Sequence, residues 1–461
     1  MRNCISTRIT RPLSALSVLS IVLPIVLSIV LSSFSVAALA EERSLVLIHT
    51  NDFHGHIKQE NEYAGAARIA ALVKQTRANR DGVLVLDAGD AISGTPVSTM
   101  FKGAPIFEVL NMVGYDAGAI GNHEFDHGYE RIEKFREIAD YPLLSANAFA
   151  PGGNLIADSP ALIQEVNGIT IAIIGLITDY TPNMITPTGN EGISFGPPLY
   201  SLAAVVRAVR PHVDLVIAVS HVGHEEEKQL ARDIDGIDII VGGHSHTLVD
   251  PPVRVNDTYV VQANYYGTHV GYLDMMVDVD KGGITHLKGG LIPAAELPPP
   301  DPAVEAKVAE WEARVEELVD IQIAEADKTY TRPELRPILE AILADATDTP
   351  FGFYNMGGIR DTIREGTITA RHIWNIEPFG NTLVTVTTDG ATLKKILTMD
   401  GEQHYRIDEI IDDKIYTFGT NSFVGAQAKR RSPDAVIVSD KGLLVRDVLI
   451  DHIKLYGVVK P

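Results

Sequence analysis

Cysteine is almost absent from this chain of 461 residues. Its one cysteine, Cys4, lies in the basic start of the sequence, before a long apolar run. A domain folded from the rest of the chain therefore contains neither a disulfide nor a cysteine nucleophile. The position of Cys4 ahead of the apolar run also excludes it as a lipid-anchoring cysteine.

Apolar runs long enough to cross a membrane are absent too, with one exception. Residues 13–34 are apolar, follow three arginines and precede the small residues Ala38 and Ala40. This order is the pattern of an export signal. We predict that residues 1–40 are a signal peptide, that the protein is periplasmic or secreted, and that the mature chain has no stable membrane insertion. The alternative is an uncleaved N-terminal membrane anchor.

Positive charge is scarce. The chain has 39 Lys and Arg against 60 Asp and Glu, a formal net charge of −21. Nucleic-acid polymers need a basic surface and are therefore excluded as partners. A small phosphate ester would need local positive charge, which bound metal ions can supply.

The sequence beyond the signal divides into two parts. From about residue 45 to 291, apolar runs alternate with helical stretches at 64–79, 129–138, 202–209 and 225–232, the pattern of an α/β fold with a parallel sheet covered on both faces. Four prolines between positions 298 and 302 then precede a helical pattern at 303–319, which we interpret as a hinge and connecting helix. We predict domains at 41–291 and 320–461 joined by a linker at 292–319, with second-domain strands at 383–387, 414–419 and 435–439.

Five polar clusters follow apolar runs in the first part. The runs, at residues 45–48, 83–86, 117–120, 215–219 and 237–241, have the length and β-branched content of buried parallel strands. Side chains at the carboxyl ends of such strands meet at one sheet edge, where α/β proteins build their sites. The candidates are Asp52, His54, Asp90, Asn122, His123, Asp126, His221, His244 and His246.

These residues combine carboxylate, amide and imidazole ligands around Asp90, which is placed to bridge two ions. Two divalent ions roughly 3.5 to 4 Å apart can hold a hydroxide and clamp the attacking and leaving oxygens of a displacement at phosphorus. Nitrogen and oxygen ligands together favour zinc, manganese or iron over calcium. The sequence therefore predicts a metal-dependent hydrolase.

The order of the clusters resembles a known family. The forms Asp52-Phe53-His54, Gly121-Asn122-His123-Glu124-Phe125-Asp126 and Gly242-Gly243-His244-Ser245-His246 look like those of calcineurin-like metallophosphatases, and more closely like the secreted 5′-nucleotidase family, which includes periplasmic UDP-sugar hydrolases. The resemblance implies an N-terminal metallophosphatase αββα sandwich, joined by a linker helix to a smaller, divergent C-terminal 5′-nucleotidase-type α/β domain.

The same resemblance implies two divalent metal ions, zinc, manganese or similar, as cofactors. One ion would be held by Asp52, His54, Asp90 and His246, and the other by Asp90, Asn122, His221 and His244. His246 stands where the family often has Gln or Asn. His123 and Asp126 look like the catalytic dyad, in which a cationic His123 stabilises developing charge and Asp126 orients its ring. The nearby His49 and His56 are interpreted as packing or supporting groups, and Asp87 as structural.

The second part carries the proposed substrate residues. Its blocks Asn355-Met356-Gly357-Gly358-Ile359-Arg360 and Glu377-Pro378-Phe379-Gly380-Asn381 resemble family motifs, which implies substrate binding by Asn355, Gly358, Arg360 and Phe379. A core position is an equally good interpretation of Phe379. Residues 420–431 lack the family's glycine-rich block with a second stacking ring, which predicts a base sandwich without its opposite wall. Arg332 and Arg336 are both candidates for the arginine beside the phosphate.

Together these features predict a secreted two-metal phosphoesterase that hydrolyses nucleotide phosphate esters by metal-hydroxide attack at phosphorus. The alternatives keep the metal site but act on a cyclic phosphodiester, a sugar phosphate or a sulfur ester. A non-enzymatic binding protein is disfavoured, because metal storage would not require His123 and Asp126. The expected partner is a small phosphate ester.

Overall fold

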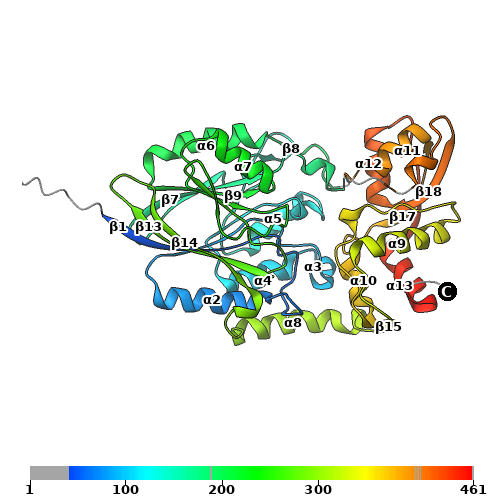
Figure 1. Ribbon diagram of the computed structural model, residues 1–461, viewed down its shortest axis with the longest axis horizontal. Helices are drawn as coiled ribbons and strands as arrows, with labels where there is room; N and C mark the ends of the chain where they lie inside the picture. The colour runs from blue at the N-terminus through cyan, green and yellow to red at the C-terminus, as the bar shows by residue number, and fades with distance from the viewer. Residues whose placement is uncertain (1–40, 187–188, 400, 402–403, 405, 459–461) are drawn as a thin grey trace, which may run out of the picture. The chain divides into compact units, whose positions relative to one another are not determined.

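The computed structural model describes residues 41–186, 189–399, 401, 404 and 406–458. The predicted signal peptide lies outside the described residues. One compact unit covers Glu42–Pro461. Figure 1 shows a larger region of this unit, which ends with α8, and a smaller region that begins at β15.

The larger region contains two six-stranded sheets. In spatial order the first has β14 (Ile284–Pro293), β13 (His269–Asp278), β1 (Glu42–Thr50), β2 (Val83–Asp87), β3 (Ala117–Ala119) and β4 (Leu143–Leu144). The second has β11 (Val253–Val255), β12 (Thr258–Val261), β10 (Ile239–Gly242), β9 (Leu215–His221), β7 (Ile169–Ile177) and β6 (Ala161–Val166). A short separate pair joins β5 (Ala148–Phe149) and β8 (Ser194–Phe195).

The two sheets pack face to face. Side chains alternate between the two faces of each strand, so each strand contributes to the core between the sheets and to an outer core. In β1, Leu45 and Leu47 enter a core that also holds Ile171 and Ile173 of β7, whereas Val46 and Ile48 point to the outer core of the first sheet. The sequence pattern predicted one parallel sheet, and this was wrong. Fully buried strands look alike in sequence whichever sheet they join, and β13, β14, β6 and β11 add antiparallel neighbours.

Helices cover the outer faces of both sheets (Figure 1). The first sheet is covered by α2 (Gly65–Asn79), α3 (Pro96–Met100), α4 (Ala104–Val113) and α5 (Glu130–Ile138), and the second by α6 (Pro198–Val209) and α7 (His224–Asp233). The predicted helices at 64–79, 129–138, 202–209 and 225–232 are therefore confirmed, as are the five predicted strands. The layered arrangement is the αββα sandwich that the resemblance implied.

The connecting helix α8 (Pro302–Val319) packs with the larger region. Its first turn is capped by Asp301, whose Oδ1 accepts hydrogen bonds from the backbone N–H groups of Ala303 and Val304. Its buried apolar residues, spaced three or four apart, join the core under the first sheet: Val304, Val308, Trp311, Val315 and Val319. The apolar face of α8 thus belongs to the core of the larger region.

The smaller region is an α/β structure with its own two cores. Its strands are β15 (Gln322–Ala326) paired with β16 (Gly366–Thr369), and a three-stranded antiparallel sheet of β18 (Ile415–Asn421), β17 (Thr382–Asp389) and β19 (Ile437–Leu444). Its helices are α9 (Arg332–Thr347), α10 (Ala370–Ile376), α11 (Gly390–Leu397), α12 (Ser422–Arg431) and α13 (Val445–Tyr456). The three strands predicted here are confirmed.

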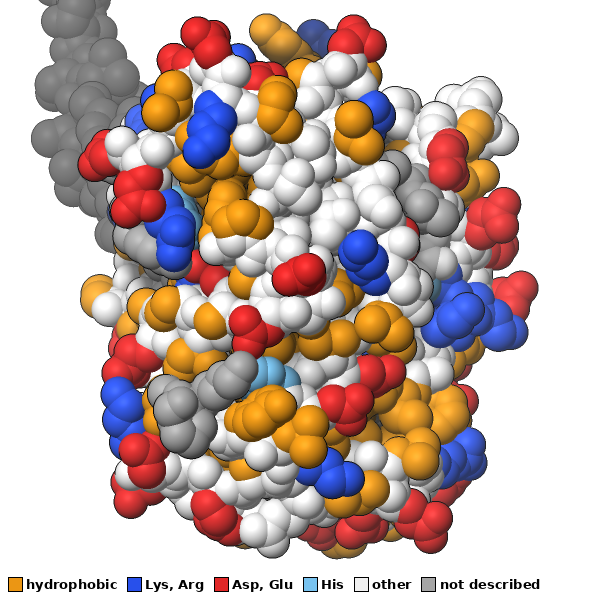
Figure 2. Space-filling model, turned by 90° about the vertical axis from the view of Figure 1, so that its right-hand side faces the viewer, with side chains coloured by type: hydrophobic (Ala, Val, Ile, Leu, Met, Phe, Trp, Pro, Cys, Tyr) orange, Lys and Arg blue, Asp and Glu red, His pale blue; other side chains and the backbone are white. Residues whose placement is uncertain are grey.

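The surface agrees with the charge of the sequence. On the face shown in Figure 2, Lys and Arg side chains lie singly or in small groups among acidic ones. None of the helices in the described ranges is both long enough and apolar enough to cross a bilayer.

Candidate active site

The predicted ligands follow the carboxyl ends of five strands, three in the first sheet and two in the second. Backbone bonds tie neighbouring loops together: Asp52 N donates to Gly89 O at 2.9 Å, and His54 N donates to Asp90 O at 2.9 Å. Gly243 brings the second sheet's loop against the first, since a Cβ there would lie 2.8 Å from the Ala88 carbonyl oxygen. Only glycine permits this approach.

Backbone conformation marks these loops as unusual. Five of the predicted ligands have left-handed backbone: Asp52 (φ 50°), His54 (φ 50°), Asp90 (φ 54°), His244 (φ 73°) and His246 (φ 53°). Non-glycine residues rarely adopt this region, and such strain persists where surrounding contacts hold it, often at functional sites.

The ligand atoms converge in three groups, each with its atoms within 4.8 Å of one another. The groups are Asp52, His54 and His246; Asp90, His221 and His244; and His54, Asp90 and His123. In the first, His246 Nε2 lies 3.2 Å from Asp52 Oδ1 and 3.3 Å from His54 Nε2. In the second, His221 Nε2 lies 3.0 Å from Asp90 Oδ2. Asp90 and His54 each belong to two of the groups.

Two imidazoles are oriented as metal ligands require. His54 Nδ1 lies 2.8 Å from Ser93 O, and His221 Nδ1 lies 2.7 Å from Ala88 O. A carbonyl partner fixes the proton on Nδ1 and turns the Nε2 lone pair into the site. The buried Asn122 Oδ1 has no hydrogen-bond partner among the described residues. Two carboxylates, four imidazoles and this amide oxygen fit divalent transition metals.

His123 and Asp126 form a close pair at the edge of this cluster. His123 Nδ1 lies 2.8 Å from Asp126 Oδ2, and its backbone N–H donates to Asp90 Oδ1 at 2.8 Å. Burial by itself lowers the pKa of His123, but the charges of Asp126 and Asp90 outweigh it, so the pKa is raised above its ordinary value. A cationic imidazole is thus favoured beside the ligands.

Glu124 is a site residue that sequence reasoning missed. Its buried carboxylate accepts backbone hydrogen bonds from Gly121 at 2.7 Å, Ala91 at 2.9 Å and Asp90 at 3.0 Å. It therefore fixes the loop of Asp90 to the loop of Asn122 and His123. The signal was its position between assigned residues of one block, but its role depends on backbone groups that no side-chain pattern reveals.

The remaining polar residues around the first loop, which the sequence analysis interpreted as structural, contact other protein groups. Asp87 accepts a hydrogen bond from Thr50 Oγ1 at 2.8 Å. The ring of His56 stacks on that of Tyr266, with 4.2 Å between the ring centroids. His49 is buried against Gly271 of β13.

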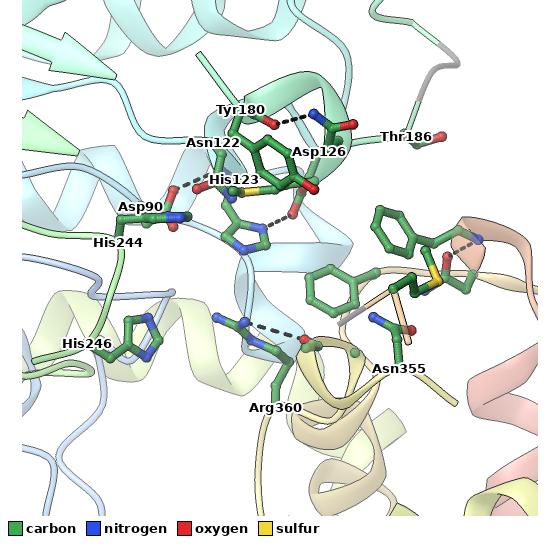
Figure 3. A pocket seen from close by; sticks show the side chains of 18 of the residues that line it. Asp90, Asn122, His123, Asp126, Tyr180, Thr186, His244, His246, Asn355 and Arg360 are labelled. Atoms are coloured by element: carbon green, nitrogen blue, oxygen red, sulfur yellow. Dashed lines mark hydrogen bonds and ion pairs between the residues drawn. The ribbon is translucent and has the colours of Figure 1, made fainter. Parts of the chain in front are cut away.

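A cavity of about 290 Å³ connects this cluster with the smaller region. Figure 3 shows Asp90, His244 and His246 on one side, Asn355 on the other, and His123 and Arg360 between them. All four predicted substrate residues line it: Asn355, Gly358, Arg360 and Phe379. Asp52, His54 and His221 are buried and are not part of its lining.

Arg360 and Phe379 reach the metal-ligand cluster directly. Arg360 Nη2 lies 3.1 Å from His54 Nε2. The Phe379 ring is nearly parallel to that of His123, with centroids 5.6 Å apart. The guanidinium carbon of Arg360 lies over the same phenylalanine ring, 5.8 Å from its centroid. Phe379 is therefore a cavity residue and not part of either hydrophobic core of its region.

Two observations bear on expectations about the smaller region. Phe423 lines the same cavity as Phe379, from the first turn of α12, and is a candidate for the second ring that the sequence predicted to be missing. Of the two candidate arginines, Arg336 is buried, bonds Glu340 at 3.1 Å and lies over Phe353, away from the cluster. Arg332 instead lies near Arg360. The pKa of the Arg332 guanidinium is lowered, first by burial and then by the positive charge of Arg360.

Further lining residues were not anticipated. The larger region contributes Tyr180, Asn183, Met184 and Thr186, and α12 contributes Arg431. These segments also bond one another, since Arg430 Nη1 donates to Pro182 O at 2.7 Å. No local motif marks such residues, because their place depends on how two distant segments meet.

Comparison with known proteins supports this arrangement. Residues 45–248 match the family described as calcineurin-like phosphoesterase, and residues 314–430 match the 5′-nucleotidase C-terminal domain. The chain is 31% identical over 408 residues to a 5′-nucleotidase of Bos taurus, covering 76% of this chain and 71% of that protein.

Other similarities agree. The trifunctional nucleotide phosphoesterase YfkN of Bacillus subtilis is 27% identical over 90% of this chain, which spans only 34% of that longer protein. Among solved structures, a 5′-nucleotidase precursor from Thermus thermophilus superimposes with a TM-score of 0.80 at 25% identity, covering 90% of this chain and 96% of that one.

Proposed function

Because the chain belongs to the 5′-nucleotidase family of calcineurin-like phosphoesterases and is a metal-dependent hydrolase of phosphate esters, we propose that it hydrolyses nucleotide phosphate esters at a centre of two divalent ions. The observation that carries this proposal is the cavity that runs from the His123–Asp126 pair to the aromatic side chains of Phe379 and Phe423.

The two ions would be held by the residues that the sequence assigned. The first set is Asp52, His54, Asp90 and His246, and the second is Asp90, Asn122, His221 and His244. When bound, such ions supply an activated water and polarise phosphoryl oxygens. The convergence of these side chains and the carbonyl-held tautomers of His54 and His221 support the assignment.

The chain's own residues would stabilise charge and orient the ester. His123, kept cationic by Asp126, would donate a hydrogen bond to an oxygen on which negative charge develops. Arg360 would bind an oxygen of the same phosphate through its planar donor fork. Phe379 and Phe423 would contact the two faces of a base, and the amide of Asn355 would contact its edge.

The location and limits of the domains are also proposals. We infer export from residues 1–40, and therefore a periplasmic or secreted enzyme whose partner is a small phosphate ester. The course of α8 suggests that the first functional domain extends to Val319 and the second begins near Asp320.

A hydrolysis panel tests the proposed substrate class. Purified protein reconstituted with Mn²⁺ or Zn²⁺ should release phosphate from AMP at a higher kcat/KM than from p-nitrophenyl phosphate. The same panel contains a UDP-sugar, 2′,3′-cyclic AMP, a sugar phosphate and a sulfur ester. A higher kcat/KM for one of the last three than for AMP would make that compound class, in place of nucleotide esters, the proposed substrate.

A further inference from the structure

Glu377 is a fully buried carboxylate behind the wall of the cavity. It lies just before Phe379 in the chain and does not line the cavity itself. The smaller region lines the cavity with residues of three segments, 354–358, 377–381 and 421–423, and with Arg360, Met399 and Arg431. Phe379 and Phe423 lie on two of these segments.

The two carboxylate oxygens of Glu377 bind two of these segments. Oε2 accepts a hydrogen bond from the hydroxyl of Tyr354, the residue before Asn355. Oε1 accepts one from Asn381 Nδ2 at 2.9 Å and a longer one from the Asn381 backbone N–H at 3.4 Å. The turn that carries Phe379 is thus closed on itself and fixed to the segment of Asn355.

Asn381 extends this connection to the third segment. Its Oδ1 accepts hydrogen bonds from Ser422 Oγ and from the backbone N–H of Phe423, each at 3.2 Å. The side-chain donor and acceptor of Asn381 are therefore both engaged with protein, although the residue lines the cavity. We call Tyr354, Glu377 and Asn381 the wall clamp.

The surroundings allow Glu377 to act in either protonation state. A charged neighbour is Arg446 of α13. Its guanidinium carbon lies 3.5 Å from the centre of the Trp374 ring, and its Nη1 donates to the Glu377 main-chain oxygen at 3.3 Å. Burial raises the pKa of Glu377 to about 7, against the opposing effects of Asn381 and Arg446. An ionised carboxylate accepts from both partners, whereas a protonated one keeps Asn381 on Oε1 and donates from Oε2 to Tyr354.

We propose that Glu377 is a positioning residue that determines selectivity for base-containing esters, because the wall clamp ties the turn of Phe379 to the segment of Asn355 and to the backbone of Phe423. This inference rests on the proposed function and deepens it. Glu377 acts only through Tyr354 and Asn381, so its loss should affect substrates with a base and spare small esters.

Kinetics of three variants test this role. Glu377→Ala, Glu377→Gln and the control Val386→Ala, which truncates a buried side chain of β17 outside the cavity, are reconstituted with Mn²⁺ and assayed with AMP and p-nitrophenyl phosphate. In Glu377→Ala, KM for AMP should rise at least about tenfold and KM for p-nitrophenyl phosphate change less than about twofold. Glu377→Gln should restore the wild-type ratio, since its amide can accept from Asn381 and donate to Tyr354.

Three results would overturn the proposal. The first is an unchanged KM ratio in Glu377→Ala, and the second is a glutamine variant as impaired as the alanine variant. The third is an equal change of the ratio in Val386→Ala, because a general loosening of the fold would then suffice. If Glu377→Ala does not fold, Tyr354→Phe, which lacks only the hydroxyl, should raise KM for AMP by about threefold, and no rise would refute the clamp. A wild-type protein without preference for AMP would instead refute the proposed function.

Discussion

Asp90 is the residue on which both proposed ion sites depend. It belongs to two of the three ligand groups, and its Oδ1 also accepts the backbone N–H of His123. We expect Asp90→Ala to reduce metal content from about two ions per chain to well below one, because both sets of ligands lose their shared carboxylate. Elemental analysis of reconstituted protein measures this.

The matched control for that variant is Asp87→Asn, three residues earlier. Asp87 bonds Thr50 and lies outside the ligand groups. Its substitution should leave about two ions bound. One ion retained at full occupancy in Asp90→Ala would show that the sites do not share this residue.

His123 belongs to one of the three ligand groups and also to the proposed dyad. If it stabilises charge and does not bind metal, His123→Ala should lower kcat by roughly 10² or more while metal content stays near that of the wild type. Steady-state kinetics and elemental analysis on the same sample separate the two roles. A parallel loss of metal would make His123 a ligand, as its proximity to His54 and Asp90 allows.

Glu377 should also make stability depend on pH. Burial raises its pKa from 4.5 in the unfolded chain to about 7 in the folded state, so its contribution is fully present below pH 4.5 and is lost as pH rises through about 7. Glu377→Gln removes this titration. We expect the Tm of the variant relative to wild type to be higher at about pH 8 than at about pH 5, measured by thermal unfolding. Val386→Ala should show a Tm difference that does not depend on pH.

At the scale of elements, the turn of Phe379 and the first turn of α12 form facing parts of one cavity. Phe379→Ala should raise KM for AMP by the equivalent of about 1 to 3 kcal/mol if the ring stacks on a base, and Phe423→Ala should act in the same direction. The measurement is the ratio of KM for AMP to KM for p-nitrophenyl phosphate. The control is Phe418→Leu, a buried ring of β18 outside the cavity lining.

At the scale of the whole molecule, two regions must meet for a substrate to be enclosed. Several bonds join them: Arg371 with Glu312 at 2.7 Å, Arg364 with Glu62 at 2.8 Å, and Thr99 Oγ1 with Pro378 O at 2.9 Å. The proposed metal ligands lie in the larger region, and the residues proposed to contact a base lie in the smaller one.

A truncated mature chain that ends at Val319 should therefore fold, bind metal and hydrolyse p-nitrophenyl phosphate, but lose most selectivity among natural substrates. A chain that ends at Leu291 lacks α8 and exposes the apolar surface that this helix covers, so its Tm should be lower. Equal Tm values for the two chains would contradict the assignment of α8 to the first domain. If the chain that ends at Val319 kept its selectivity among natural substrates, the specificity residues would lie in the larger region.

The sequence by itself determined the five strands that lead to the site, three strands of the smaller region, five helices and the residue types of the site. Apolar runs of β-branched residues end in Asp, Asn and His, and these signals are local, so residues such as Asp52 and His221 could be identified without a structure. Their roles as ligands remain predictions. The four substrate residues could also be named, because short glycine-containing motifs accompany them.

Only the tertiary structure decided which sheet each strand joins and which side chains face the cavity. Helix packing separated Arg332 from Arg336, since one turn of α9 places Arg336 against Glu340 and Phe353. The packing of α12 brought Phe423 to the cavity, and Glu124 and Glu377 each accept hydrogen bonds from groups distant in sequence, namely the Asp90 and Ala91 backbone and the Tyr354 hydroxyl. Contacts between distant segments depend on three-dimensional packing, whereas sequence patterns record local periodicity and residue chemistry.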